Sequence, residues 1–210
     1  MNLVLYIFRR RSSCALRLLA LPCALNRVFA LFLILACTNG CLSTVIQSEL
    51  PAAGLVELAS GSSRPLKVYV KQTASNYAVG YQYLFFVIPF GVVRTPRLTD
   101  DIEQVLFREL SLKGYKPLIV SNEPEDQRTL IVELHEIDVS AYDYLFFRHI
   151  VSSVSFTGEL RSFRSTSRRV GPVTGRATAF KEFAFGPQLE HYFQKSLTIA
   201  TQNLLTELRL

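Results

Sequence analysis

The sequence predicts an α+β fold in which two helices pack on one face of a mostly antiparallel sheet of about five strands. Three observations predict it: segments in which apolar and polar residues alternate, two segments with apolar residues at helical spacing, and turn residues between them. The expected order is β-α-β-β-β-β-α over residues 65–210. Both apolar helix stripes would then be buried in a single core.

The first half of this region supplies one clear strand and one clear helix. Residues 67–71 alternate, which predicts a strand. Thr95 or Thr99 would cap a helix whose acids at 100, 101 and 103 lie near the positive end of its dipole. Gly114 ends the helix. Its apolar stripe consists of Leu98, Ile102, Val105, Leu106 and Leu110.

The second half is richer in strands. Residues 115–120, 129–141 and 150–163 predict strands, and the acidic residues 122–128 form a loop. A turn at 171–175 leads into a further strand at 175–185. Pro187 opens a closing helix that runs to about residue 209. Its apolar stripe consists of Leu189, Tyr192, Phe193, Leu197, Ala200, Leu204 and Leu208.

The N-terminal segment has the composition of an export signal. All four cysteines lie in the first 41 residues, and the first 36 contain five arginines and no acid. The apolar run at 28–36 has nine residues, whereas a spanning helix needs about 20. A basic region followed by a short apolar run and a small residue predicts a cleaved signal peptide over residues 1–36.

The end of this segment, Ile34-Leu35-Ala36-Cys37, resembles the lipobox of bacterial lipoproteins. In that family the cysteine is acylated, with palmitate among its fatty acids, and becomes the mature N-terminus. The resemblance implies lipidation at Cys37 and a lipidated, flexible tether over residues 37–64. An aspartate after the cysteine is the family's inner-membrane signal, and this chain has Thr38. The resemblance therefore implies anchoring in the outer membrane, with the domain facing the periplasm.

Net charge changes once the signal segment is set aside. The full chain has 23 basic and 17 acidic residues, and removal of five arginines leaves 18 against 17, about +1. The basic character therefore belongs to the targeting segment. We expect no nucleic-acid partner.

Residues that could carry catalysis are few. His135, His149 and His191 lie far apart, and no pair has metal-ligand spacing. Asp100 and Asp101 are adjacent on the predicted helix, where helix capping explains them better than acid-base catalysis. The sequence contains no glycine-rich phosphate loop and no serine in a nucleophile elbow. We expect neither an enzyme nor a bound cofactor or metal.

Two aromatic segments, YQYLFF at 81–86 and YDYLFF at 142–147, differ only at their second position. Neither alternates with polar residues, so each needs apolar cover on both sides. They are either core (neighbouring strands, or a loop under the helix) or an exposed patch that contacts a partner or lipid. We expect the two segments to lie together at one end of the sheet. The candidate contact residues are Tyr81, Tyr83, Phe85, Phe86, Tyr142, Tyr144, Phe146 and Phe147.

A run of arginines without an acid lies between Leu160 and Lys181. It is either a solvated basic turn or a contact with phosphate-bearing lipid or an acidic partner, because guanidinium groups match phosphate oxygens. The candidate anionic contacts are Arg161, Arg164, Arg168 and Arg169.

The predicted architecture of residues 65–210 resembles, in topology only, small periplasmic lipoproteins that assist envelope transport. These are the auxiliary lipoproteins of lipid-trafficking ABC transporters and the lipopolysaccharide-assembly lipoprotein. The resemblance implies a non-catalytic, lipid-anchored cell-envelope protein that binds a protein partner or lipid in transport or assembly. The alternatives are a structural envelope lipoprotein without a ligand and a hydrolase with an atypical motif.

Overall fold

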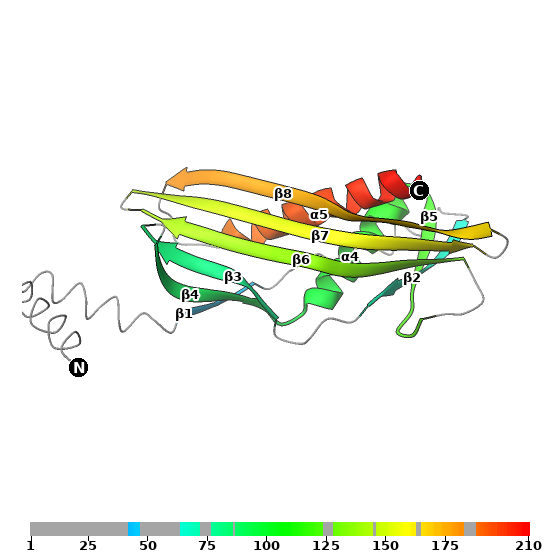
Figure 1. Ribbon diagram of the computed structural model, residues 1–210, viewed down its shortest axis with the longest axis horizontal. Coiled ribbons are helices and arrows are strands. Elements are labelled where there is room, and N and C mark those ends of the chain that lie inside the picture. Colours follow the sequence, from blue (N-terminus) through cyan, green and yellow to red (C-terminus); the bar gives the residue numbers. More distant parts are fainter. Residues whose placement is uncertain are drawn as a thin grey trace, which may run out of the picture. The chain divides into compact units, whose positions relative to one another are not determined.

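An eight-stranded sheet and two helices make up the part of the chain that the computed structural model describes (Figure 1). That part comprises residues 42–46, 64–71, 77–85, 87–123, 128–144, 146–162, 165–182 and 188–210. The helices are α4 (Leu98–Leu112) and α5 (Gln188–Leu208). The strands are β1 (Leu42–Val45), β2 (Arg64–Val70), β3 (Tyr77–Leu84), β4 (Ile88–Thr95), β5 (Tyr115–Ile119), β6 (Thr129–Asp143), β7 (Phe147–Ser162) and β8 (Ser165–Glu182).

The long strand β6 organises the sheet. One edge of β6 pairs with antiparallel β7 along almost its whole length, and β7 pairs in turn with β8. The other edge is shared: the start of β6 pairs in parallel with β2, and its end pairs in parallel with β3. Strand β2 also pairs with β5, while β3 pairs with β4, and β4 pairs in turn with β1. The sheet therefore divides into two branches on one side of β6.

The predicted sheet of about five mostly antiparallel strands is wrong, because the sheet has eight strands and mixes parallel with antiparallel pairs. The sequence analysis missed β1, β3 and β4. Pro89 and Gly91, residue types that are rare inside strands, both lie inside β4. Pro89 stands opposite Tyr83, beside a register shift in the β3–β4 pair, and a proline is tolerated at such an irregularity. Strand β1 lies within the segment expected to be a tether.

The predicted turn at 171–175 is also wrong, since these residues lie inside β8. Phe156 pairs with Val173 and Gly158 with Val170, so Gly171 and Pro172 form a bulge in a continuous strand. Gly171 has a φ of 125°, a conformation that residues with a Cβ rarely adopt. Glycine and proline therefore mark a bulge here and not the end of a strand.

Helix α5 packs directly on β7 and β8. A Cβ on Gly175 would lie 2.2 Å from the Ser196 carbonyl oxygen, so at this point the helix backbone touches the strand backbone. Next to it, the buried hydroxyls of Ser152 and Ser196 are 2.7 Å apart, and Ser196 donates to the carbonyl of Phe193 at 2.8 Å. These contacts satisfy both hydroxyls in the core. The predicted boundaries of this helix agree closely with the structure.

Helix α4 also follows its predicted apolar stripe but not its predicted cap. Arg97 occupies the capping position and makes no side-chain capping bond. Of the two predicted caps, Thr99 lies inside the helix, and Thr95 ends β4 and donates its hydroxyl to the Asp101 carboxylate at 3.2 Å. Gly114, with a φ of 80°, follows the helix as expected.

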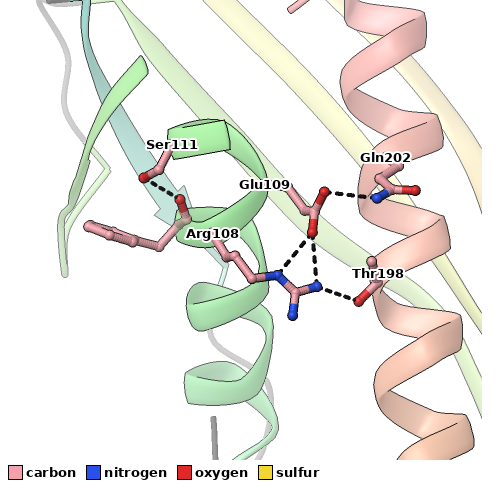
Figure 2. A network of polar contacts seen from close by, with 6 residues as sticks. Arg108, Glu109, Ser111, Thr198 and Gln202 are labelled. Carbon is pink, nitrogen blue, oxygen red and sulfur yellow. Dashed lines mark hydrogen bonds and ion pairs between the residues drawn. The ribbon is translucent and has the colours of Figure 1, made fainter. Parts of the chain in front are cut away.

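Polar contacts join the two helices (Figure 2). The carboxylate of Glu109, which is 5% exposed, accepts bonds from Arg108 Nε at 3.0 Å and from Gln202 Nε2 at 2.9 Å. Arg108 also donates to Thr198 Oγ1 at 2.9 Å. A buried carboxylate needs such partners, so this network fixes α4 against α5. Both helices lie on the same side of the sheet, behind it in Figure 1, and leave the other face open.

Candidate functional site

The two aromatic segments lie side by side in the sheet. Strands β3 and β6 pair in parallel where the segments meet, with Tyr83 opposite Tyr142 and Leu84 opposite Asp143. The Phe85 amide donates to the carbonyl of Asp143 at 2.9 Å. The predicted proximity of the segments is therefore confirmed. Because the pairing is offset by two residues, equivalent positions of the two segments do not face each other.

Four rings form a continuous row across four strands, which we call the aromatic row: Tyr83, Tyr142, His149 and Phe180. Tyr83 and Tyr142 stack with centroids 5.1 Å apart and an interplanar angle of 11°. Tyr142 and His149 lie 5.9 Å apart, and His149 and Phe180 lie 4.2 Å apart at 2°. Each neighbouring pair is also a directly opposite pair in the sheet. Cross-strand aromatic pairs of this kind stabilise sheet edges and fix register.

The aromatic row lies on the open face of the sheet. Along β7, the buried residue Ile150 points toward the helices, so its neighbour His149 points away from them. The same alternation on β3 places the buried Gln82 on the helix face and the exposed Tyr81 on the open face. In Figure 1 this end of the sheet is where β3 and β6 finish and β8 finishes, at the left.

Exposed apolar side chains surround the row, and together with it they form what we call the aromatic end. The largest exposed fractions are 81% for Phe146, 77% for Val87 and 69% for Phe180. Phe146 belongs to the β6–β7 turn and Val87 to the β3–β4 turn, so both hairpin tips are apolar. The exposed members beyond the row are Tyr81, Phe85, Val87, Ile88, Phe146 and Phe147.

Both hairpin tips are held in place. Arg148 donates to both carboxylate oxygens of Asp143, a residue that is 2% exposed, and its Nη2 lies 2.9 Å from Oδ2. The Tyr144 amide donates to the carbonyl of Phe147 at 2.9 Å, and the rings of these two residues stack 4.2 Å apart. In the other tip, Phe85 has a φ of 50°. A bulky side chain rarely adopts this conformation, and such outliers concentrate at functional sites.

Tyrosine hydroxyls at the aromatic end stay neutral. Removal from water raises the pKa of Tyr83, with the nearby Tyr142 as the next cause. The same effect raises the pKa of Tyr144. Since an ordinary phenol has a pKa of about 10, both hydroxyls carry no charge at physiological pH. The Tyr83 hydroxyl can donate or accept hydrogen bonds at the boundary between apolar and aqueous surroundings, whereas the Tyr144 hydroxyl is buried.

Of the candidate anionic contacts, the structure brings together Arg161 and Arg169, which both line the charged hollow described in the next paragraph. Arg161 bonds to Glu123 at 2.6 Å and to Glu159 at 2.9 Å, so its charge is already matched. Arg168 and Arg169 stand opposite Leu160 and Glu159 and so lie on opposite faces of the sheet. Arg164, like Cys37 and Phe86, lies outside the described residues. A shared phosphate site of the four arginines remains a prediction without geometric support in the described part.

A shallow charged hollow of about 270 Å³ occupies the other end of the open face. Three basic and three acidic side chains line it, and Lys71 pairs with Glu133 at 2.7 Å. The hydrogen bond from Lys71 lowers the pKa of Glu133, and the same bond raises the pKa of Lys71. Its lining consists of Tyr69, Lys71, Glu123, Ile131, Glu133, Thr157, Glu159, Arg161 and Arg169.

The three histidines have separate surroundings. His149 belongs to the aromatic row, His135 is exposed beside an irregularity in β6, and His191 meets the Tyr192 ring edge-on. Within the described ranges, no three side chains of the metal-binding types gather closely enough to hold an ion. None of the described helices is long and apolar enough to span a bilayer.

Sequence reasoning found much of the aromatic end but missed His149, Phe180, Val87 and Ile88. The first two join the row only through the register of β7 and β8. Val87 and Ile88 directly follow the first aromatic segment and extend its apolar run. That run could have indicated that they belong to the same site.

No protein-family model and no curated protein matches the sequence of this chain. Solved structures are similar to it at low levels, among them the following two. One is protein XCC0632 from Xanthomonas campestris, family model DUF330, with 13% identity and a TM-score of 0.40 over 80% of this chain and 97% of that chain. The other is a homolog of neuraminyllactose-binding hemagglutinin from Helicobacter pylori, with 14% identity and a TM-score of 0.30 over 71% and 88%. Similarity this low assigns no function, so the site is interpreted from its own residues.

Proposed function

We propose that this chain is a non-catalytic, lipid-anchored protein of the bacterial cell envelope that binds a protein partner or lipid in transport or assembly. It is held in the outer membrane by acylated Cys37, and its domain faces the periplasm. The aromatic end is its binding surface. Two observations support the proposal: the lipobox-like sequence at residues 34–37, and the exposed rings that two hairpin tips present together.

The exposed rings carry the greater part of the proposal. Moving a side chain as large as that of Phe146 or Phe180 out of water is favourable by about 1.5–3 kcal/mol. A large contiguous apolar surface on a soluble domain usually marks a contact with a partner or membrane. Among the described residues, the exposed phenylalanines all lie at this end, whereas the hollow at the other end is lined mainly by charged and polar side chains.

The anchor is tested by Cys37→Ser. Because acylation and cleavage both need the thiol, the variant should accumulate as an unprocessed precursor or leave the membrane fraction. Intact-mass spectrometry and membrane fractionation measure these outcomes. Cys41→Ser is the matched control and should leave both properties unchanged. A Cys37→Ser protein with wild-type mass and wild-type membrane partition would contradict the anchor.

The binding surface is tested by a photo-cross-linking phenylalanine analogue at position 146, in living cells. We expect cross-linked products from this position, separable into protein and lipid adducts by protease treatment and lipid extraction. The control position is Leu118, an exposed apolar residue of β5 in the other branch of the sheet. If neither position gives a product, the chain is better described as a structural envelope component without a ligand.

A further inference from the structure

Strand β1 brings the N-terminal segment into the sheet at the aromatic end. Leu42 stands opposite Gly91 of β4, Gly91 opposite Gln82 of β3, and Gln82 opposite Ala141 of β6. This line of residues is directly adjacent to the aromatic row, because Tyr83 follows Gln82. Strand β1 is parallel to β4, and β4 runs away from the β3–β4 tip. The chain before Leu42 therefore enters the sheet at the end that carries the exposed rings.

The entry point of the chain is fixed by contacts of β1 and Ile46 with β3, β4 and the core. The Gln82 side-chain amide donates to Thr44 Oγ1 at 2.6 Å, across the intervening strand β4. The Ile46 amide donates to the carbonyl of Arg94 at 2.9 Å, and the Ile46 side chain is buried in the core. Strand β1 is thus a packed part of the sheet with a defined register on β4.

The connection between the lipidation candidate and this entry point is short. Only four residues, 38–41, separate Cys37 from Leu42. Fully extended, that link spans at most roughly 18 Å. An acyl anchor at Cys37 would therefore keep Leu42, the entry point at the aromatic end, within that distance of the bilayer surface, whereas the charged hollow lies at the far end of the long strands.

The chemistry of the aromatic end suits the interfacial region of a bilayer. The tip residues Phe146 and Val87 are apolar, and the tyrosines behind them combine an apolar ring with a neutral hydroxyl. Tyrosine is enriched at the depth where lipid headgroups meet the acyl chains. Lys181, exposed beside Phe180, supplies a cation at the level of headgroup phosphates.

We infer that the aromatic end inserts its two hairpin tips into the same membrane that holds Cys37. This inference rests on the proposed lipid anchor and names the membrane surface as the occupant of the site. The short link and the exposed rings act together: the anchor places the tips at the membrane, and the tips fix the orientation of the domain on it. The long strands then point away from the bilayer, and the charged hollow faces the aqueous compartment.

A tryptophan reporter tests the inference, because the natural chain has no tryptophan. The full-length acylated Phe146→Trp protein is reconstituted into vesicles of phosphatidylethanolamine and phosphatidylglycerol. The tryptophan emission should shift to the blue relative to that of a tryptophan exposed to water, and brominated lipids should quench it. Phe180→Trp, on another strand of the same end, repeats the measurement if the first variant folds poorly. The matched control is Leu118→Trp, which should show neither effect.

Three results would overturn the inference. The first is an unshifted and unquenched Phe146→Trp in protein-free vesicles. The second is equal quenching of Phe146→Trp and Leu118→Trp, which would mean contact without the inferred orientation. The third is a shift that occurs only in native envelope vesicles, which would assign the tips to a protein partner.

Failure of the anchor itself gives a separate signal. If Cys37 carries no acyl group, the intact mass shows it before any fluorescence is measured, and the proposed function loses its anchor. The unanchored Phe146→Trp protein can then be titrated with the same vesicles. A blue shift that is absent in Leu118→Trp would still support membrane contact by the tips, and an unshifted emission would overturn it.

Discussion

The two faces of strands β6, β7 and β8 are built from alternating residues of the same segments, yet they are covered in different ways. On the helix face, Ile150, Val154 and Phe156 are fully buried under the helices. On the open face, one end carries the aromatic row and the other carries the charged hollow. The helix face is therefore covered by the chain itself, whereas neither described helix covers the open face.

This difference separates residues that hold the fold from residues that are available for function. At the charged hollow, ion pairs such as Lys71–Glu133 and Arg161–Glu159 match opposite charges in the presence of water. Water does not stabilise the exposed apolar rings of the aromatic end in this way. Their burial becomes favourable only when another surface covers them. Function is therefore better sought at the aromatic end than at the hollow.

The largest effect should come from removing a ring on the helix face. We expect Phe156→Ala to lower the free energy of unfolding by about 3–5 kcal/mol, because it leaves a cavity in a fully buried position. The matched change on the open face, Phe180→Ala, should cost less than about 1 kcal/mol. Urea denaturation measures both. Equal losses would remove the distinction between the two faces.

A smaller effect should follow from breaking the buried ion pair behind the tips. We expect Arg148→Met to cost about 3 kcal/mol, since it leaves the Asp143 carboxylate buried without its bidentate partner. The double variant Asp143→Asn with Arg148→Met should recover part of this loss, because no buried charge remains. Denaturation of the four proteins in the cycle gives the coupling. A double variant as unstable as the sum of the single variants would show that the pair does not act as a unit.

The smallest effect should be found at the charged hollow and should depend on pH. The pKa of Glu133 is lowered in the folded state by the hydrogen bond from Lys71. The contribution of Glu133 to the free energy of unfolding is therefore fully present above the ordinary carboxyl pKa of about 4.3. It is lost as the pH falls through the lowered pKa of the folded state. Glu133→Gln should cause a small, salt-sensitive loss of stability near neutral pH that disappears in acid.

Denaturation across this pH range, with and without added salt, measures the difference between Glu133→Gln and the unchanged protein. Glu136→Gln, at an exposed glutamate of the same strand, is the control and should not reproduce the pH profile. A loss that persists at acid pH would mean that Glu133 contributes through packing and not through its charge.

Local patterns in the sequence predicted the individual elements well where one period dominated. The apolar stripe of residues 98–110 and that of residues 189–208 both correspond to observed helices, and the alternation of residues 67–71 corresponds to β2. Strands β3 and β4 were missed because Tyr, Phe, Val and Ile occupy both of their faces around Pro89. Without alternation, neither their ends nor their pairing could be predicted.

The candidate site was predictable in part. The shared location of the two aromatic segments followed from their common need for apolar cover. The addition of His149 and Phe180 did not, because it depends on the register of β6 with β7 and of β7 with β8, which alternation within one strand does not fix. The arginines were misinterpreted for a different reason: they were expected at a turn, but Arg168 and Arg169 lie within β8, where neighbours in sequence project to opposite faces.

The direct contact between α5 and β8 at Gly175 also limits how the sequence can diverge over evolution. Any side chain at this position would collide with the backbone at Ser196 and Ala200, so a substitution requires the helix to move as a whole. The adjacent position on the open face, Arg176, is exposed and carries no such restriction. Relatives that keep this helix on this strand should therefore retain glycine at position 175 while position 176 varies freely.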